Sequence, residues 1–169
     1  MSFEQDIQQE DFQNEYQKAL LNMLFTNYYM VDKMNGVFKK HDITRQQYNV
    51  MRILRGQLPG HASINLIKDR MLDKMSDASR IVERLRVKGF VTREFCEKDK
   101  RSVEVRITQT GLAVLDKMQT EVNAFEDILH NLTEDETHTL NHLLDKVRGS
   151  DKVKQTSTKQ TLEAETSSR

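Results

Sequence analysis

One stretch of the chain, residues 63–108, constrains the fold more than any other. Two short segments, 64–72 and 75–88, have apolar residues at helical spacing and are separated by only two polar residues. Two further segments, 90–95 and 102–107, alternate apolar and polar residues and flank a charged tip. Helix, helix and hairpin in this order predict a winged helix-turn-helix, in which one helix fits the DNA major groove and the hairpin tip reaches a neighbouring groove.

Capping signals place the helices at the start of this unit. Thr44 and Gln47 have the spacing of a capping box, while Ile43 and Tyr48 stand at the positions of a hydrophobic staple. We therefore expect a helix from Thr44 that ends near Gly56, with its apolar residues facing inward. Ser63 is the expected cap of the following helix, and Gly89 the expected left-handed stop of the helix after that.

Residues 4–40 predict one long N-terminal helix. Its apolar residues recur every three or four positions and form a single stripe. A stripe of this length cannot be buried on a small module alone, so it requires a partner helix, with a second subunit as one source. The stripe comprises Phe12, Tyr16, Leu20, Leu24, Tyr28, Val31, Met34 and Phe38.

The same pattern returns after the hairpin. Residues 109–131 carry a second helical stripe, and Thr133 with Glu136 forms another capping box at the start of a last helix. Beyond Gly149 the chain becomes rich in Thr, Ser, Lys and Glu and has few apolar residues. We expect a disordered polar tail there.

Charge is distributed unevenly although the net charge is zero. Residues 44–107 carry +7, whereas residues 1–43 carry −3 and residues 108–148 carry −5. A basic middle between acidic flanks indicates a polyanion bound at one place. Chance asymmetry on solvated helix faces is the alternative explanation.

The helix predicted over residues 75–88 has two distinct faces. Its inward side, expected to pack on the two preceding helices, comprises Met75, Ala78, Ile81, Val82 and Leu85. Its outward side is the candidate for base contacts, because a recognition helix enters the groove at its N-terminal end. The candidate residues on and beside this side are Ser76, Asp77, Ser79, Arg80 and Arg84.

The chemistry of this outward side suits DNA. Arginine can hold guanine through two hydrogen bonds or clamp a phosphate, and small serines allow close approach. Asp77 could accept a hydrogen bond from a cytosine amino group, or simply favour the N-terminus of the helix. An ordinary solvated helix face is the alternative for the whole set.

The hairpin tip gathers cations where a wing would meet DNA. Arginine is favoured in a narrow minor groove by the enhanced negative potential there. Asp99 can hold Arg101 in place by a charged hydrogen bond. The candidate wing residues are Lys98, Asp99, Lys100 and Arg101.

The run from Asp99 to Gly111 resembles the wing and the following helix start of the MarR family (multiple antibiotic resistance regulators). That family shows an Asp–x–Arg wing motif followed by Leu-Thr-x-x-Gly, and Ile107 takes the leucine position here. Residues 79–91 also resemble the family's recognition helix and wing start. The resemblance covers residues 7–148 and implies a mainly α protein with a small β-hairpin wing.

The resemblance also implies a division of labour along the chain. Residues 1–40 and 109–148 would supply long dimerisation helices, and residues 41–108 the winged helix-turn-helix that binds DNA; the tail 149–169 lies outside it. The expected protein is a homodimer on a pseudo-palindromic operator in double-stranded DNA. Proteins of this family commonly repress transcription and are released by a small molecule or an oxidant.

Effector pockets in this family often lie between the dimer body and the winged unit. Tyr28, Tyr29, His41 and Tyr48 fall near that junction in the sequence and are the candidate pocket residues. Packing in the core is the alternative role for these aromatic side chains.

Two further candidates for chemistry have ordinary alternatives. Cys96 has cations nearby, which would favour a reactive thiolate; Glu97 is adjacent, however, and peroxide sensors of the family carry their cysteine near the N-terminus. His138 and His142 have the spacing of a zinc-binding pair, but no further ligand is evident. We therefore expect no metal or cofactor site, and no redox role for Cys96.

Several function classes are disfavoured by what the chain contains. A single cysteine gives neither an intramolecular disulfide nor a Cys-based zinc site, and no apolar run is long enough for a bilayer. The acidic N-terminus does not resemble a signal peptide, so a cytoplasmic, nucleoid-associated protein is expected. No enzyme motif is found. The alternative to a DNA-binding regulator is a winged-helix module that binds an acidic protein partner without sequence-specific DNA binding.

Overall fold

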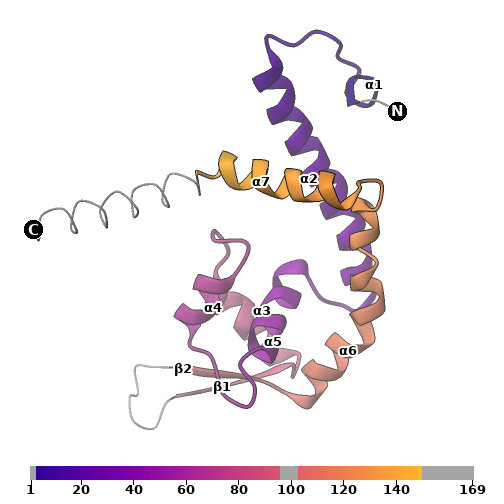
Figure 1. Ribbon diagram of the computed structural model, residues 1–169. Coiled ribbons are helices and arrows are strands. Elements are labelled where there is room, and N and C mark those ends of the chain that lie inside the picture. Colours follow the sequence, from indigo (N-terminus) through magenta and orange to yellow (C-terminus); the bar gives the residue numbers. More distant parts are fainter. Residues whose placement is uncertain (1–2, 96–102, 150–169) are drawn as a thin grey trace, which may run out of the picture. The chain divides into compact units, whose positions relative to one another are not determined.

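The computed structural model describes residues 3–95 and 103–149. Within these residues it contains seven α-helices, one short 3-10 helix and a two-stranded antiparallel sheet (Figure 1). They form two compact units, one ending at Phe125 and the other beginning at Glu126. The expected class, mainly α with a small β-hairpin, is confirmed.

The prediction of a single helix over residues 4–40 is wrong near its start. A short helix α1 (Phe3–Ile7) is separated from the long helix α2 (Glu15–Lys40). The Asn14 side chain accepts a hydrogen bond from the Gln17 N–H at 3.0 Å, and the Gln17 side chain accepts one from the Gln13 N–H at 2.8 Å. This reciprocal capping starts α2 at Glu15 and leaves the preceding residues outside it.

The N-terminal segment packs back on α2. The Phe3 ring lies 5.9 Å from the Phe12 ring and 5.8 Å from the Phe25 ring. Glu4 forms an ion pair with Lys18. The aromatic contacts explain why the break between the helices does not leave α1 without a partner.

Helices α3 (Arg45–Arg55) and α4 (Ile64–Arg70) begin as the sequence predicts. Thr44 and Gln47 form the capping box, with hydrogen bonds of 3.2 and 3.0 Å in the two directions. The Ser63 hydroxyl accepts the Leu66 N–H at 3.1 Å and so caps α4. The two staple residues are both buried, as a hydrophobic staple requires.

Helix α5 (Ala78–Val87) begins three residues later than predicted. Asp77 is its N-cap, because its carboxylate accepts a hydrogen bond from the Arg80 N–H at 3.1 Å. Met75 therefore lies in the preceding turn, and it is 95% exposed instead of packing inward. The other predicted inward residues do pack on the core: Ala78, Val82 and Leu85 are buried, and Ile81 is partly buried.

The end of α5 matches its predicted stop. Gly89 has a φ of +74°, which only glycine adopts readily. The Gly89 N–H donates to the Arg86 carbonyl at 2.9 Å and the Phe90 N–H donates to the Leu85 carbonyl at 3.0 Å. This double closure turns the chain directly from α5 into the hairpin.

The hairpin consists of β1 (Val91–Phe95) and β2 (Val103–Ile107). Its register pairs Val91 with Ile107 at the open end, next to the helices, and Phe95 with Val103 near the tip. Ala62, between α3 and α4, adds two backbone hydrogen bonds to Val105, at 3.0 and 2.9 Å. The hairpin is thereby attached to the helices by backbone as well as by side chains.

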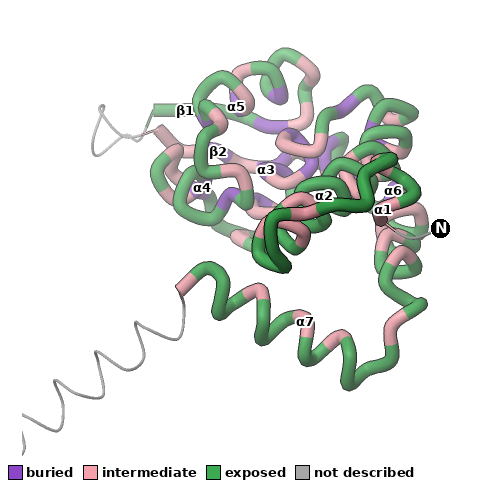
Figure 2. Tube along the Cα trace, turned by 90° about the horizontal axis from the view of Figure 1, so that it is seen from above, coloured by how far each residue is buried: buried purple, intermediate pink, exposed green. Residues whose placement is uncertain are grey.

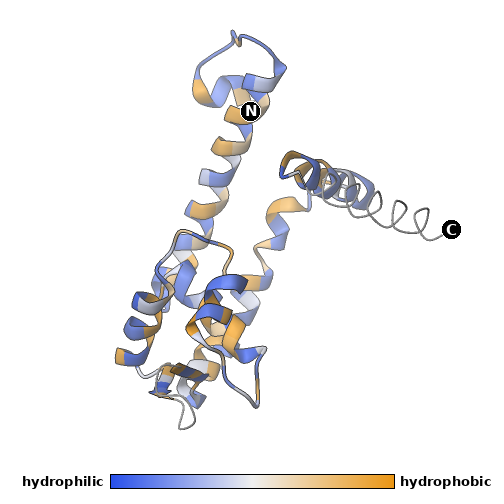
Figure 3. Ribbon diagram, turned by 90° about the vertical axis from the view of Figure 1, so that its left-hand side faces the viewer, coloured by the Kyte–Doolittle hydropathy of each residue, from blue (hydrophilic) through white to orange (hydrophobic). Residues whose placement is uncertain are grey.

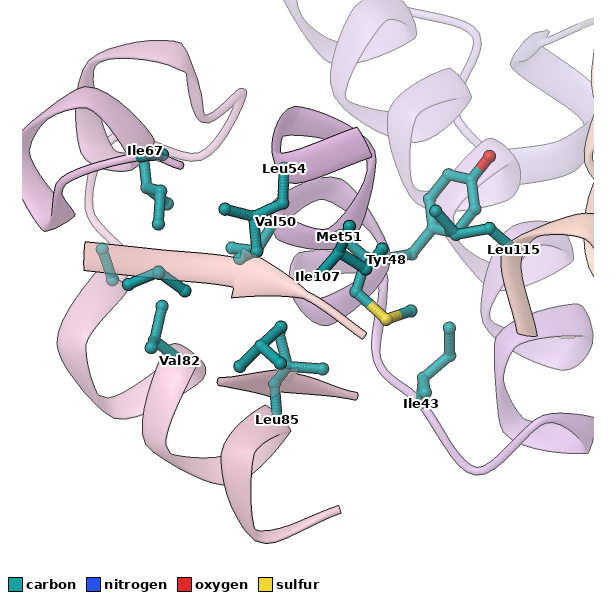
Figure 4. Packing of buried hydrophobic residues seen from close by; sticks show 14 of the residues in the cluster. Ile43, Tyr48, Val50, Met51, Leu54, Ile67, Val82, Leu85, Ile107 and Leu115 are labelled. Carbon is teal, nitrogen blue, oxygen red and sulfur yellow. The ribbon is translucent and has the colours of Figure 1, made fainter. Parts of the chain in front are cut away.

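The core lies between α3, α5, the hairpin and helix α6 (Gln109–Asn123), as Figure 4 shows. Apolar side chains from all four elements meet there, and α4 closes one side. The largest fully buried members are Met51, Leu54, Ile67, Met71, Leu85, Leu115, Met118, Val50, Val82 and Val105.

The predicted helix over residues 109–131 is also shorter than expected. Helix α6 ends at Asn123, and a 3-10 helix η1 covers Glu126–Leu129. The Phe125 N–H bonds to the carbonyl of Val122 at 3.0 Å, a tighter closure than that of an α-helix, which ends the α pattern.

Helix α7 (Glu134–Val147) in the second unit begins with the predicted capping box at Thr133 and Glu136. It ends just before Gly149, whose φ is +77°. The predicted disordered tail from residue 150 lies outside the described residues.

A close approach at Gly111 generates a stability prediction. A Cβ at Gly111 would stand 2.3 Å from the Phe90 carbonyl oxygen and 2.9 Å from the Ile107 side chain. We expect Gly111→Ala to lower the free energy of unfolding by about 2 kcal/mol, because backbone must shift to admit the methyl group. Urea denaturation would measure this loss.

Gly36→Ala is the matched control for this experiment. Gly36 lies inside α2, and apart from its chain neighbours and the backbone of its own helix no atom lies within 4 Å of the added Cβ. The free energy of unfolding should stay the same or rise by up to about 1 kcal/mol, since alanine is the better helix former. Equal losses from the two substitutions would contradict the proposed clash at Gly111.

Candidate nucleic-acid interface

The outward face of α5 presents two arginines in different states. Arg80 is 82% exposed in its side chain, and its Nε lies 3.3 Å from the Asp77 carboxylate. Arg84 is exposed and has no carboxylate partner among the described residues. Ser79 is exposed beside them. The structure therefore brings together three of the candidate residues on one solvent-facing side of α5.

The other two candidates on this side lie before the helix, in the turn that leads into it. The Ser76 hydroxyl donates to the Asp73 carboxylate at 2.7 Å. Asp77 caps the helix, and this role accounts for an acidic side chain beside a basic face. Of the two explanations open for Asp77, the geometry favours the helix start over a cytosine contact.

A charged network ties α5 to the hairpin. Arg86 donates two hydrogen bonds to one Glu83 carboxylate oxygen and one to the other, at 2.8 to 3.2 Å. Arg93 of β1 approaches the same carboxylate at 3.8 Å. The hydrogen bonds from Arg86 hold the pKa of the Glu83 carboxyl below its usual value. Arg93 thus has a charged partner on the helix.

Lys98, Asp99, Lys100 and Arg101 lie outside the described residues, as does Cys96. The strands that lead to them are described, and Phe95 pairs with Val103 where they stop. The hairpin register therefore brings Phe95 and Val103, the described residues on either side of the tip, next to each other.

A cavity of about 640 Å³ lies between α5 and the segment that joins α2 to α3. Its apolar lining includes Phe38, Ile43 and Val87. Its charged lining includes Lys39, Asp42, Arg84 and Lys88. The Lys88 ammonium is 2.9 Å from the Asp42 carboxylate, so these two charges are already paired across the cavity wall. Lys39 and Arg84 form no ion pair with any residue described.

The predicted pocket residues do not line this cavity. Tyr28 is 71% exposed on α2, and Tyr29 is also exposed. Tyr48 is in the core, with its ring 5.1 Å from the Phe38 ring. The His41 Nε2 lies 2.5 Å from the Glu121 carboxylate of α6. Hydrogen bonds from His41, and to a lesser degree from Lys40, lower the pKa of Glu121. The four candidates therefore have different surroundings: two are exposed on α2, one is in the core and one is paired with α6.

Sequence reasoning missed the cavity because its walls come from segments about forty residues apart. Only tertiary packing brings Arg84 of α5 and Lys39 of α2 into the lining of one cavity. The one usable sequence signal is Arg84 on the outward face of the predicted helix.

His138 and His142 lie on α7, and no three His, Cys, Asp or Glu side chains gather as a metal site in residues 3–95 and 103–149. No helix in the described part of the chain combines the length and the apolar character needed to cross a membrane.

Comparison with known proteins agrees with this architecture. The sequence profile of the MarR family matches residues 41–102. The transcriptional repressor IacR of Pseudomonas putida is 31% identical over 115 residues, covering 68% of each chain. The multiple antibiotic resistance protein MarR of Escherichia coli is 32% identical over 116 residues, covering 68% of this chain and 79% of that protein.

A solved structure extends the comparison to the fold. The crystal structure of a mutant MarR from Escherichia coli in complex with operator DNA superposes with a TM-score of 0.69 at 28% identity. The match covers 82% of this chain and 99% of that one.

The capping role of Asp77 can be separated from a base-reading role. Asparagine caps helices as well as aspartate does, whereas alanine does not. We expect Asp77→Asn to keep the free energy of unfolding and Asp77→Ala to lower it by about 1 kcal/mol, as measured by urea denaturation. A new base preference at one operator position in Asp77→Asn, with stability unchanged, would instead assign Asp77 to a cytosine.

Proposed function

This chain belongs to the MarR family of DNA-binding transcriptional regulators, and from that premise we propose that it is a homodimeric repressor of a pseudo-palindromic operator. The observation that carries the proposal is the outward face of α5, where exposed arginines stand on a helix whose opposite side is buried beneath a hairpin. A similar protein is known in complex with operator DNA. We infer the same class of partner for this chain.

In this proposal the winged unit makes two kinds of contact. The face of α5 reads base edges in the major groove, with Arg80 and Arg84 as the principal donors and Ser76, Ser79 and the Asp77 cap beside them. The tip grips the adjacent minor groove through Lys98, Lys100 and Arg101, with Asp99 orienting Arg101.

The exposed half of α2 supports the homodimer. Phe38, at the C-terminal end of the α2 stripe, is buried in the core. Towards the N-terminal end the stripe remains exposed, as the exposed colouring of α2 in Figure 2 shows, and hydrophobic residues recur along the α2 ribbon in Figure 3. Exposed apolar surface of this extent marks a protein interface. The open residues of the stripe are Tyr16, Leu20, Leu24 and Tyr28.

We further propose the functional division expected from the sequence. Residues 1–40 and 109–148 would serve dimerisation, residues 41–108 would bind DNA, and residues 149–169 would form a polar tail. A repressor of this kind would act on the chromosome in the cytoplasm, as a binding protein and not as an enzyme.

We place the effector site in the cavity beside α5. Its apolar wall suits a small flat molecule, and Lys39 with Arg84 suits an anionic group on it. The cavity wall includes the C-terminal half of α5, so a bound molecule would displace the helix and change the spacing of the two recognition helices in the dimer. The required spacing is about one turn of DNA, ~34 Å.

Selection of bound sequences from random duplex DNA at near-physiological salt tests the DNA-binding proposal. We expect an inverted repeat with half-sites about one turn apart. Arg84→Ala and Arg101→Ala should each weaken binding to that repeat by tenfold or more, since each removes a charge-assisted contact. Fluorescence anisotropy would measure the Kd, and sedimentation would show that each variant remains a dimer.

Arg86→Ala is the matched control for these arginine variants. It removes an equal charge from α5, but its guanidinium is already engaged by Glu83. Its affinity for the operator should stay within about threefold of that of the wild type. If no sequence is enriched and all variants bind DNA weakly and alike, the protein-interaction module becomes the better explanation.

The effector proposal is tested with benzoate as a probe. Benzoate should release the operator from the wild-type protein, and Lys39→Ala should raise the concentration needed by about tenfold without changing operator affinity in its absence. Lys33→Ala is the control, because Lys33 lies on the same helix beside the Tyr29 ring, away from the cavity. If both variants respond equally to benzoate, then benzoate does not act at this cavity.

A further inference from the structure

Two large apolar side chains stand exposed in the turn that leads into α5. Met75 is 95% exposed and Leu72 is 87% exposed. Single exposed apolar residues are ordinary on protein surfaces. These two, however, lie three positions apart, immediately before the N-terminal end of the helix that we propose enters the major groove.

The turn is held in one conformation by its own hydrogen bonds and by α3. The Asp73 carboxylate accepts the Met75 N–H at 3.1 Å and the Ser76 hydroxyl at 2.7 Å. The Leu72 N–H donates to the Asn49 side chain of α3 at 3.1 Å. These bonds fix the backbone at both apolar residues, so their outward position follows from the fold.

The surroundings of the two side chains are cationic. Residues 68–80 contain three acids. Two of them are hydrogen-bonded to backbone, Asp73 in the turn and Asp77 in the helix cap. Four exposed cations stand close in the chain on either side of the turn or within it: Lys68, Arg70, Lys74 and Arg80. Apolar side chains framed by cations suit a polyanion that also offers apolar groups.

DNA offers one apolar group in the major groove, the 5-methyl group of thymine. We propose that Met75 and Leu72 contact thymine methyl groups and so select A·T pairs at one or two positions of each half-site. This inference rests on the proposed function. It assigns base preference to the turn, in addition to the arginines of α5.

Replacement of thymine by deoxyuridine tests the inference, because it removes the methyl group and leaves every hydrogen-bonding group in place. In the operator recovered by selection, thymines would be replaced one at a time. At one or two positions the wild-type Kd should rise by about fourfold, the loss expected for one buried methyl group. Met75→Ala or Leu72→Ala should bind the thymine and uracil forms of that position equally.

Leu58→Ala is the matched control, since Leu58 is an exposed apolar residue in a different loop. It should retain the fourfold preference for thymine. Because both turn residues are highly exposed, their alanine variants should keep the wild-type Tm, which a thermal scan would verify.

The outcomes separate this inference from the function beneath it. If the wild type selects an operator but tolerates uracil at every position, or if both turn variants keep the thymine preference, the inference is overturned and the repressor proposal stands. If the wild type selects no operator, the repressor proposal fails and the inference fails with it.

Discussion

The packing of the inner side of α5 against α3 and the hairpin is the interaction on which the candidate interface depends. Val82 and Leu85 are completely buried there, and each contributes about 1.5–3 kcal/mol relative to an exposed position. Burial of this side fixes the rotation of the helix about its axis. The arginines on the other side are exposed as a consequence, in a direction that the core determines.

The two ends of α5 complete this constraint, and both are fixed by short local devices. Asp77 starts the helix through one hydrogen bond to its first turn, and Gly89 ends it through a left-handed residue that leads straight into β1. The hairpin is in turn attached to Ala62 by two backbone hydrogen bonds. A helix fixed in rotation, start and end can present side chains to a rigid groove with little conformational entropy left to lose on binding.

The features that sequence predicted well are the ones encoded locally. Capping boxes at Thr44 and Thr133 and the stop at Gly89 depend on residues within a few positions of one another, and all three are observed. The two wrong helix starts also arise from local signals, because in each case a capping signal competes with an apolar period. Met75 fits the apolar period of α5, but the capping preference of Asp77 outweighs that period and places Met75 in the turn. In α2, Asn14 and Gln17 carried a capping signal that the continuous apolar stripe concealed.

The cavity illustrates what local patterns cannot contain, because Arg84 and Lys39 come to line one cavity only through packing. Its position suggests how an effector signal would travel. The cavity adjoins the C-terminal half of α5, where Arg84 is both a lining residue and a proposed base donor, whereas the other proposed base contacts of α5 lie at its N-terminal half and in the turn before it. A helix of ten residues is about 15 Å long and behaves as a rigid body. Displacement at one end must therefore move the other, and the Lys88–Asp42 pair at the cavity wall would be among the first contacts to change.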